Sequence, residues 1–191
     1  MEKVVIINAS PRKKGYSAKM VDYISNKLEE KEITYKVYNI YDMNIDYCNH
    51  CGYCKHVKGC RIKDDMTDLI SHIINSSSTI VISPTAFDGP MAKFKTLVDR
   101  TNCIYHSKYT LHDSMIDRSK NRIGLLIQIG GASNYPTQFL GGDTICGFFF
   151  KCINTKLKHK IYITNIDKED PLETKIEMID KEIDLYLNDL I

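Results

Sequence analysis

The sequence lacks a long apolar run, an excess of one charge, and any low-complexity or linker segment. No apolar stretch approaches the roughly 18 residues that a membrane-spanning helix needs, so we expect no membrane partner. Lys and Arg total 26 against 24 Asp and Glu, and the net charge of +2 gives no broad basic field for nucleic acid. The expected partner is therefore a small molecule or a locally recognised protein.

The cysteine content argues against a secreted, disulfide-stapled protein. Seven cysteines, an odd number, cannot all pair within one chain. Residues 1–3 lead directly into an apolar strand pattern rather than into a signal peptide, which predicts a cytoplasmic protein. In a reducing compartment, clustered cysteines are better used for metal or redox chemistry than for disulfides.

Five strand patterns are spread along the chain. Nearly continuous apolar runs at 4–7, 80–82 and 125–129 predict parallel strands that are buried on both faces. Alternating patterns at 33–37 and 161–163 predict strands that are covered less evenly, as at sheet edges. With these two at the edges, the strand order is 2-1-3-4-5. A ligand is then expected at the switch point between strands one and three, by their carboxyl ends.

Helical periodicity separates the strands. It covers residues near 17–31, 65–76, 90–104, 143–153 and 171–190. Asp170 can cap the last helix, and Pro171 suits its first position. Phe148, Phe149 and Phe150 cannot all face one side of a helix, so one of them is expected to be exposed or in a dimer contact. The whole pattern predicts a single α/β domain, residues 1–191, with helices on both faces of a five-stranded parallel sheet.

The loop from Asn8 to Ser17 leaves the first strand and enters the first helix. It carries hydroxyl groups at Ser10 and Ser17, a flexible Gly15 and a cation at Arg12. The first helical turn adds unpaired N–H groups and the positive end of the helix dipole. These features match a phosphate monoester. The plain alternative is a polar surface connection.

Four cysteines lie close together after the second strand. They form the pattern C-x2-C-x2-C-x5-C within residues 48–60, at Cys48, Cys51, Cys54 and Cys60. Three cysteines at two-residue spacing favour a four-iron four-sulfur (4Fe-4S) cluster, because zinc sites usually join two pairs across a longer spacer. Zinc binding and free thiols remain open as alternatives.

The other candidate metal ligands have simpler roles. His50 and His56 lie in the same loop and are expected to be solvated, because four thiolates already complete the coordination. Cys103, Cys146 and Cys152 fall in helical patterns and are expected to be small buried hydrophobic residues.

Three motifs along the chain match a known family in type and order. They are Ser10-Pro-Arg12-x-x-Gly15-x-Ser17, the cysteine run continued by Cys60-Arg-Ile-Lys-Asp-Asp65-Met66, and Ser83-Pro-Thr-Ala-Phe87-Asp-Gly-Pro-Met-Ala92-Lys-Phe-Lys95-x-x-x-Asp99-Arg100. With them the chain resembles the flavodoxin-like NADPH-dependent FMN reductase family, and within it the iron-sulfur flavoproteins. The resemblance extends over essentially the whole chain and implies a flavodoxin-like three-layer sandwich.

The resemblance also implies which residues bind FMN. The family's phosphate loop corresponds to Ser10, Arg12, Lys14, Gly15, Tyr16, Ser17 and Ala18. The flavin ring and ribityl chain would meet Pro84, Thr85, Ala86, Phe87, Gly130, Gly131 and Ala132. Two positions depart from the family pattern. Tyr16 stands where Asn or Ser is frequent, and Ala86 stands where Tyr is frequent, which leaves one flavin face more open.

Some of these motif residues have a plain alternative. Arg12 could be a solvated surface charge, and Phe87 could simply cover the end of the sheet. Lys95, Asp99 and Arg100 are expected to form a helix-face charge pattern or a subunit interface rather than to take part in catalysis.

The resemblance implies an FMN-dependent oxidoreductase. It would pass electrons from NAD(P)H or reduced ferredoxin to a small acceptor such as a quinone or a flavin, with the 4Fe-4S cluster as a candidate relay. No catalytic side chain is required, because the chemistry belongs to the flavin. Dimers or tetramers are usual in the family, which predicts a homodimer or homotetramer. Two alternatives stay open: an electron carrier without a dedicated small substrate, and a zinc-stabilised binding module.

Overall fold

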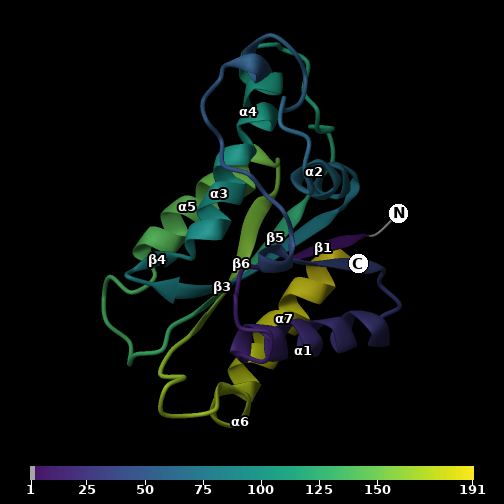
Figure 1. Cartoon of the computed structure of the whole chain (residues 1–191). Coiled ribbons are helices and arrows are strands. Elements are labelled where there is room, and N and C mark those ends of the chain that lie inside the picture. Colours follow the sequence, from purple (N-terminus) through teal and green to yellow (C-terminus); the bar gives the residue numbers. More distant parts are fainter. Residues whose placement is uncertain (1–2) are drawn as a thin grey trace.

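A parallel β-sheet forms the centre of the protein, which is described here by a computed structural model covering residues 3–191 (Figure 1). Five parallel strands pair in the order β2-β1-β3-β5-β6: β1 (Val4–Asn8), β2 (Tyr35–Asn39), β3 (Ser78–Ala86), β5 (Ile123–Ile129) and β6 (Lys156–Ile163). This is the predicted order of five strands. A short strand that was not predicted, β4 (Gly89–Pro90), pairs antiparallel with the end of β3. Met1 and Glu2, which belong to the segment used to predict the cellular location, lie outside the described residues.

Helices cover both faces of the sheet, as predicted (Figure 1). One face carries α1 (Tyr16–Glu30), α6 (Pro171–Thr174) and α7 (Ile176–Leu190). The other carries α2 (Met66–Asn75), α3 (Ala92–Arg100), α4 (Asn102–Tyr109) and α5 (Leu140–Cys152). Side chains of a strand alternate between faces, so Val4 and Ile6 pack with the first group, whereas Val5 and Ile7 pack with the second. Two hydrophobic cores result, one on each side of the sheet.

Several predicted boundaries differ from the observed ones. Strands β3 and β6 extend beyond the predicted 80–82 and 161–163, and three further differences follow. Strand β2 begins at Tyr35 rather than at Ile33, because the Ile33 amide donates to the Leu28 carbonyl and closes the end of α1 (2.9 Å). The helix predicted over 90–104 is divided between α3 and α4 at Thr101, whose hydroxyl donates to the Val98 carbonyl (2.6 Å). The last predicted helix is likewise divided, into α6 and α7 at Lys175.

Other local predictions are confirmed. The Asp170 carboxylate accepts a hydrogen bond from the Leu172 amide (2.9 Å) and caps α6, with Pro171 at the first helical position. Phe148 is exposed, whereas Phe149 and Phe150 are buried. The predicted homo-oligomer stays a prediction. Among residues 3–191, no helix is both long and apolar enough to cross a membrane.

Candidate functional site

A cavity of about 730 Å³ lies at the carboxyl ends of β1 and β3. The connections leave these two neighbouring strands in opposite directions, to β2 and to β5, so this is the expected switch point. Ten of the predicted residues line the cavity: Ser10, Arg12, Lys14, Gly15, Tyr16, Ser17, Pro84, Thr85, Ala86 and Gly131. Five lining residues were not predicted, namely Pro11, Met91, Ile129, Ile166 and Asp167. Apart from Pro11 of the first loop, these residues come from separate parts of the chain and share no local pattern, which explains why the sequence did not reveal them.

The loop before α1, residues 8–17, is held by its own short-range hydrogen bonds; we call it the phosphate loop. The Asn8 side chain accepts from the Ser10 amide, and the Ser10 hydroxyl accepts from the Arg12 amide, both at 3.2 Å. The Gly15 amide donates to the Arg12 carbonyl, also at 3.2 Å. Helix α1 starts after Gly15 without a side-chain cap, and its first turn carries no acidic residue. Its first amide groups are therefore available to an anion.

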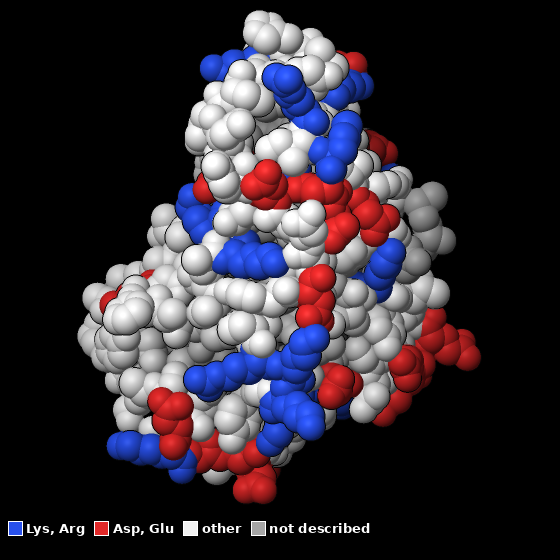
Figure 2. Space-filling model, viewed as in Figure 1, with Lys and Arg blue, Asp and Glu red and all other residues white. Residues whose placement is uncertain are grey.

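Cations accumulate around this loop. Figure 2 shows Lys and Arg side chains gathered over the start of α1. Arg12 and Lys14 are exposed and line the cavity. Lys13 does not line it, and pairs instead with the exposed Asp42 (2.7 Å). The cavity therefore receives the charge of two cations and one helix N-terminus, which together outweigh the one lining carboxylate, Asp167, and suit a phosphate group.

Thr85, which lines the cavity, carries a polar atom with no partner among the described residues. The Thr85 Oγ1 atom is buried and, among the described residues, forms no hydrogen bond. Leaving a buried hydroxyl unpaired costs stability, so such a position suits a hydrogen bond to a ligand. The Asp167 side chain packs directly against the backbone of Gly131. A Cβ atom at this position would lie 2.4 Å from an Asp167 carboxylate oxygen, so any larger residue there would displace that side chain.

Four predicted residues do not line the cavity. Ala18 faces a neighbouring cleft that also contacts Asn8. Gly130 and Ala132 pack against Gln138: a Cβ atom on Gly130 would lie 2.3 Å from its Nε2 atom, which donates to the Ala132 carbonyl. The fourth is Phe87, discussed next.

Phe87 is fully exposed at the tip of the hairpin formed by β3 and β4. Phe87 and Asp88 both have positive φ angles, 50° and 59°, as a two-residue hairpin turn requires. The Asp88 carboxylate accepts hydrogen bonds from the hydroxyls of Tyr135 and Thr137, which anchor the turn. The ring of Phe87 thus neither reaches the cavity nor covers the end of the sheet.

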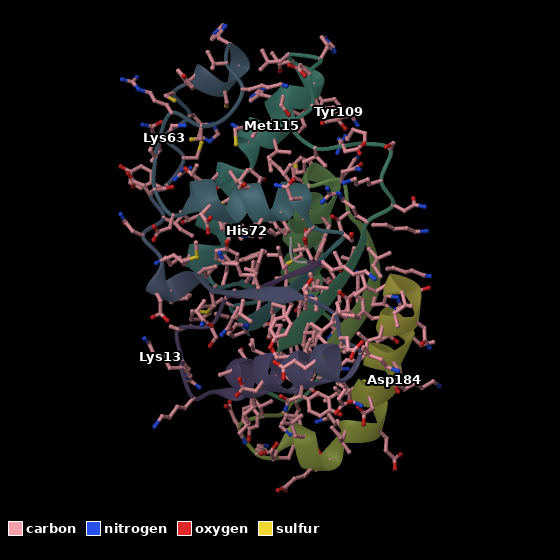
Figure 3. The ribbon with its side chains drawn as sticks, turned by 90° about the vertical axis from the view of Figure 1, so that its right-hand side faces the viewer. Lys13, Lys63, His72, Tyr109, Met115 and Asp184 are labelled. Carbon is pink, nitrogen blue, oxygen red and sulfur yellow. The ribbon has the colours of Figure 1, made fainter. Side chains whose placement is uncertain are left out.

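The four clustered cysteines line a second, separate cavity. Positive φ angles at His50 (54°), Gly52 (76°) and Gly59 (96°) turn the chain between them. We call residues 48–60 the cysteine loop. It lies at the top of Figure 1, far from the phosphate loop. In Figure 3, Lys63, just after the cysteine loop, lies in the upper part of the molecule, whereas Lys13 of the phosphate loop lies in the lower half. No residue lines both cavities.

Two thiols of this cavity, those of Cys54 and Cys103, have raised pKa values. Burial raises the pKa of Cys54, and the nearby thiols of Cys60, Cys48 and Cys51 raise it further. Cys103 belongs to the same cavity. It is buried as predicted, but it lies beneath the loop, and burial together with Cys60 and Cys54 raises its pKa to about 12. His50 and His56 are exposed.

The described part of the chain contains no ready-made binding site for a single metal ion. Within residues 3–191, no group of three or more His, Cys, Asp or Glu side chains is arranged to hold a metal ion. The four cysteines line one cavity. The metal-binding role predicted for them is therefore not established by their positions.

Arg100 differs from its expected role. Lys95 and Asp99 form the predicted pair on the surface of α3, with nitrogen and oxygen 2.7 Å apart. Arg100, at the end of the same helix, is instead buried, with only 2 % of its surface exposed, and it lines the cysteine cavity. Its partner is Asp64, 36 residues away and equally enclosed. The motif suggested a surface charge because sequence spacing cannot reveal so distant a partner.

Comparison with known proteins identifies a family and relatives for this chain. Residues 2–136 match the family described as NADPH-dependent FMN reductase. An iron-sulfur flavoprotein of Methanocaldococcus jannaschii is 31% identical over 77% of this chain and 70% of its own. Another, of Archaeoglobus fulgidus, is 29% identical over 67% of this chain but only 62% of its own length. The fold matches an FMN-dependent NADH-azoreductase of Bacillus anthracis in complex with FMN, with a TM-score of 0.67, 15% identity and full coverage of both chains.

Proposed function

We propose, since this chain belongs to the NADPH-dependent FMN reductase family, that its larger cavity binds FMN and that the protein is a flavin-dependent oxidoreductase. The observation that carries this proposal is the combination of the uncapped start of α1 with two cations at the mouth of a cavity of about 730 Å³. This volume lies within the range of cofactor pockets. A second observation supports it, namely the unpaired Thr85 hydroxyl further inside.

The chain's own residues would hold the cofactor in two parts. Arg12, Lys14 and the first amides of α1 would bind the phosphate, while the end of β3 would meet the ribityl chain and the ring. Bound FMN would supply hydride and single-electron transfer, so no side chain needs to act as acid or base. Ala86 leaves more room over the ring than the tyrosine frequent in relatives, which favours access of a flat acceptor.

We further propose that the cysteine loop holds a 4Fe-4S cluster. A single tetrahedral zinc would bring its sulfur ligands within about 4 Å of one another, given a zinc–sulfur distance near 2.3 Å. In a cubane each cysteine binds a different iron, so its thiols surround a larger space. Three of the four cysteines that line this cavity follow one another at two-residue spacing, which favours the second arrangement. The names of the curated relatives point the same way.

The expected reaction is electron transfer from NAD(P)H to a small acceptor such as a quinone or a flavin. The separate cysteine cavity favours one second candidate, an electron carrier that receives electrons from reduced ferredoxin. In either case a homodimer or homotetramer could bring the two centres of different copies together.

A steady-state assay separates these functions. NAD(P)H oxidation is followed with a quinone or with free flavin as acceptor, with and without reduced ferredoxin. A reductase oxidises NAD(P)H with the acceptor in the absence of ferredoxin. An electron carrier oxidises NAD(P)H negligibly and is reduced by ferredoxin instead. A chain that binds no FMN in a fluorescence titration would contradict both.

A further inference from the structure

Arg100 closes the base of the cysteine loop. Its Nη1 atom donates to the Asp46 carbonyl (2.8 Å), two residues before the first loop cysteine. Its Nη2 atom donates to the Ile62 carbonyl (3.3 Å), two residues after the last. The two chain segments that enter and leave the loop are thus joined through one side chain of α3.

Asp64 completes this closure. Its two carboxylate oxygens accept from Nη1 and Nη2 of Arg100 at 2.5 and 3.0 Å, a bidentate arrangement. One of them also accepts from the Asp46 amide (2.9 Å). The side chains of Arg100 and Asp64 are only 1% and 5% exposed, so solvent screens the pair little.

One donor of Arg100 is left over. Its Nε atom is buried and, among the described residues, has no hydrogen-bond partner. The guanidinium lines the cavity that the four loop cysteines share, and it lies beside Cys60. Burial opposes its charge, but the hydrogen bond to Asp64 and the nearby Cys60 thiol outweigh this effect, so the pKa of Arg100 is raised.

We propose that Arg100 is a positioning residue with two roles, one toward the loop and one toward the group that the loop holds. It fixes both ends of the cysteine loop so that the four thiols stay around one cavity. It also presents its Nε–H to the sulfur atoms of an iron-sulfur cluster in that cavity. The second role rests on the cluster proposed above. Such a donor stabilises the more negative, reduced cluster and raises its reduction potential.

The variants separate charge from hydrogen-bond geometry. Arg100→Lys keeps the charge, but an ammonium group cannot reach Asp64 and both carbonyl groups at once. Arg100→Gln combined with Asp64→Asn removes both charges together, which avoids an unpaired buried ion and favours a folded chain. Lys95→Gln removes an exposed cation of the same helix and serves as the control.

The first measurement tests the loop and needs no cluster. The full-length chains are stripped of metal with a chelator, and the rate of thiol labelling is followed at each cysteine by mass spectrometry. Both Arg100 variants should label about tenfold faster at Cys54 and Cys60, because each lost charge-assisted bond exceeds the ~1.4 kcal/mol that corresponds to a factor of ten. Buried Cys146 should label as in the wild type, which shows that the core is intact. Unchanged labelling of the loop in both variants would overturn the first role.

The second measurement tests the donor. Chains purified without oxygen are titrated for the midpoint potential of the bound cluster. Arg100→Lys should shift it to a more negative value at unchanged charge, and Lys95→Gln should leave it unchanged. An unshifted potential in Arg100→Lys overturns the donor role, because a purely structural residue would not alter it. A wild-type chain without iron also overturns it, together with the proposed cluster, while the labelling rates still decide the loop.

Discussion

The phosphate loop and the cysteine loop both follow a β-strand, but different forces hold them in place. The phosphate loop joins β1 directly to α1. Most of its hydrogen bonds connect residues two or three apart, and at its start the Ala9 amide donates to the Ile82 carbonyl of β3 (2.8 Å). The cysteine loop lies within the long connection from β2 to α2. Its base is held by Arg100 on α3 and by bonds between the two flanking segments, such as that from the Asn44 amide to the Asp65 carboxylate (2.6 Å). Local contacts therefore account for most of the shape of the phosphate loop. The second depends on contacts between residues far apart in the sequence, among which the Arg100–Asp64 pair is buried.

Removing one thiol should separate the two regions most completely. Cys54→Ala should abolish iron binding while FMN is retained, because the two cavities share no residue. Iron analysis and the flavin absorbance of the same sample measure both. Cys103→Ala is the control, since Cys103 lines the cysteine cavity outside the motif and its loss should leave iron bound. Loss of FMN together with iron in Cys54→Ala would show that the regions are not independent.

Breaking the contact at the base of the cysteine loop should cost the most stability. Asp64→Asn leaves Arg100 buried without its counter-ion, which destabilises proteins by about 3–5 kcal/mol. Urea unfolding at neutral pH measures this. Asp99→Asn removes an exposed carboxylate of α3 and should cost no more than about 0.5 kcal/mol. Equal losses in the two variants would contradict the special role of the buried pair.

The same contact predicts a pH dependence. Burial opposes ionisation of Asp64, but its bonds from Arg100 and from backbone amides outweigh this, so its pKa in the folded state is lowered. Its contribution to stability is therefore fully present above the unfolded pKa, about 3.9, and is lost as the pH falls through the lower folded value. The difference in unfolding free energy between wild type and Asp64→Asn should shrink at acid pH. A difference that grows there would contradict this assignment.

The phosphate loop should respond in FMN affinity rather than in stability. Arg12→Ala should weaken FMN binding by about 1.5–3 kcal/mol, the value of a hydrogen bond to a charged group. The fold should be unaffected, because Arg12 is exposed. Lys13→Ala is a matched control, because Lys13 points to Asp42 rather than into the cavity. Fluorescence titration with FMN compares them, and equal effects would mean that only the net charge of the loop matters.

The smallest expected effect concerns Thr85. Thr85→Val keeps the shape but removes the unpaired hydroxyl, which should weaken FMN binding by about 0.5–1.5 kcal/mol. The FMN-free protein should not lose stability, since no protein hydrogen bond is broken. Fluorescence titration with FMN gives the affinity, and thermal unfolding of the FMN-free chain gives the stability. A variant that loses stability at full FMN affinity would assign the hydroxyl to the protein rather than to the ligand.

The sequence predicted those features that depend on nearby residues. Apolar runs such as 4–7 identified the central strands, because parallel strands are covered on both faces. The N-cap at Asp170 was likewise predicted from the sequence, because it depends on the adjacent residues alone. The strand order followed from which strands were less apolar.

Features that depend on distant contacts were not predictable. Arg100 was grouped with Lys95 and Asp99, since a helix-face pattern gives no sign of a partner 36 residues away. Cys103 showed only a helical pattern, and nothing in its neighbourhood indicated that it lies beneath the cysteine loop. Phe87 was assigned by its place in a motif, whereas the turn at the tip of the β3–β4 hairpin directs it into solvent.

One measurement tests the two-centre account most directly: the absorption spectrum, with iron and zinc analysis, of protein purified without oxygen. The account predicts flavin bands with a broad additional shoulder and about four irons per chain, the composition of a cubane cluster. Flavin bands without iron, or with one zinc per chain, would contradict the role proposed for the cysteine loop. A colourless protein would contradict the account of both sites.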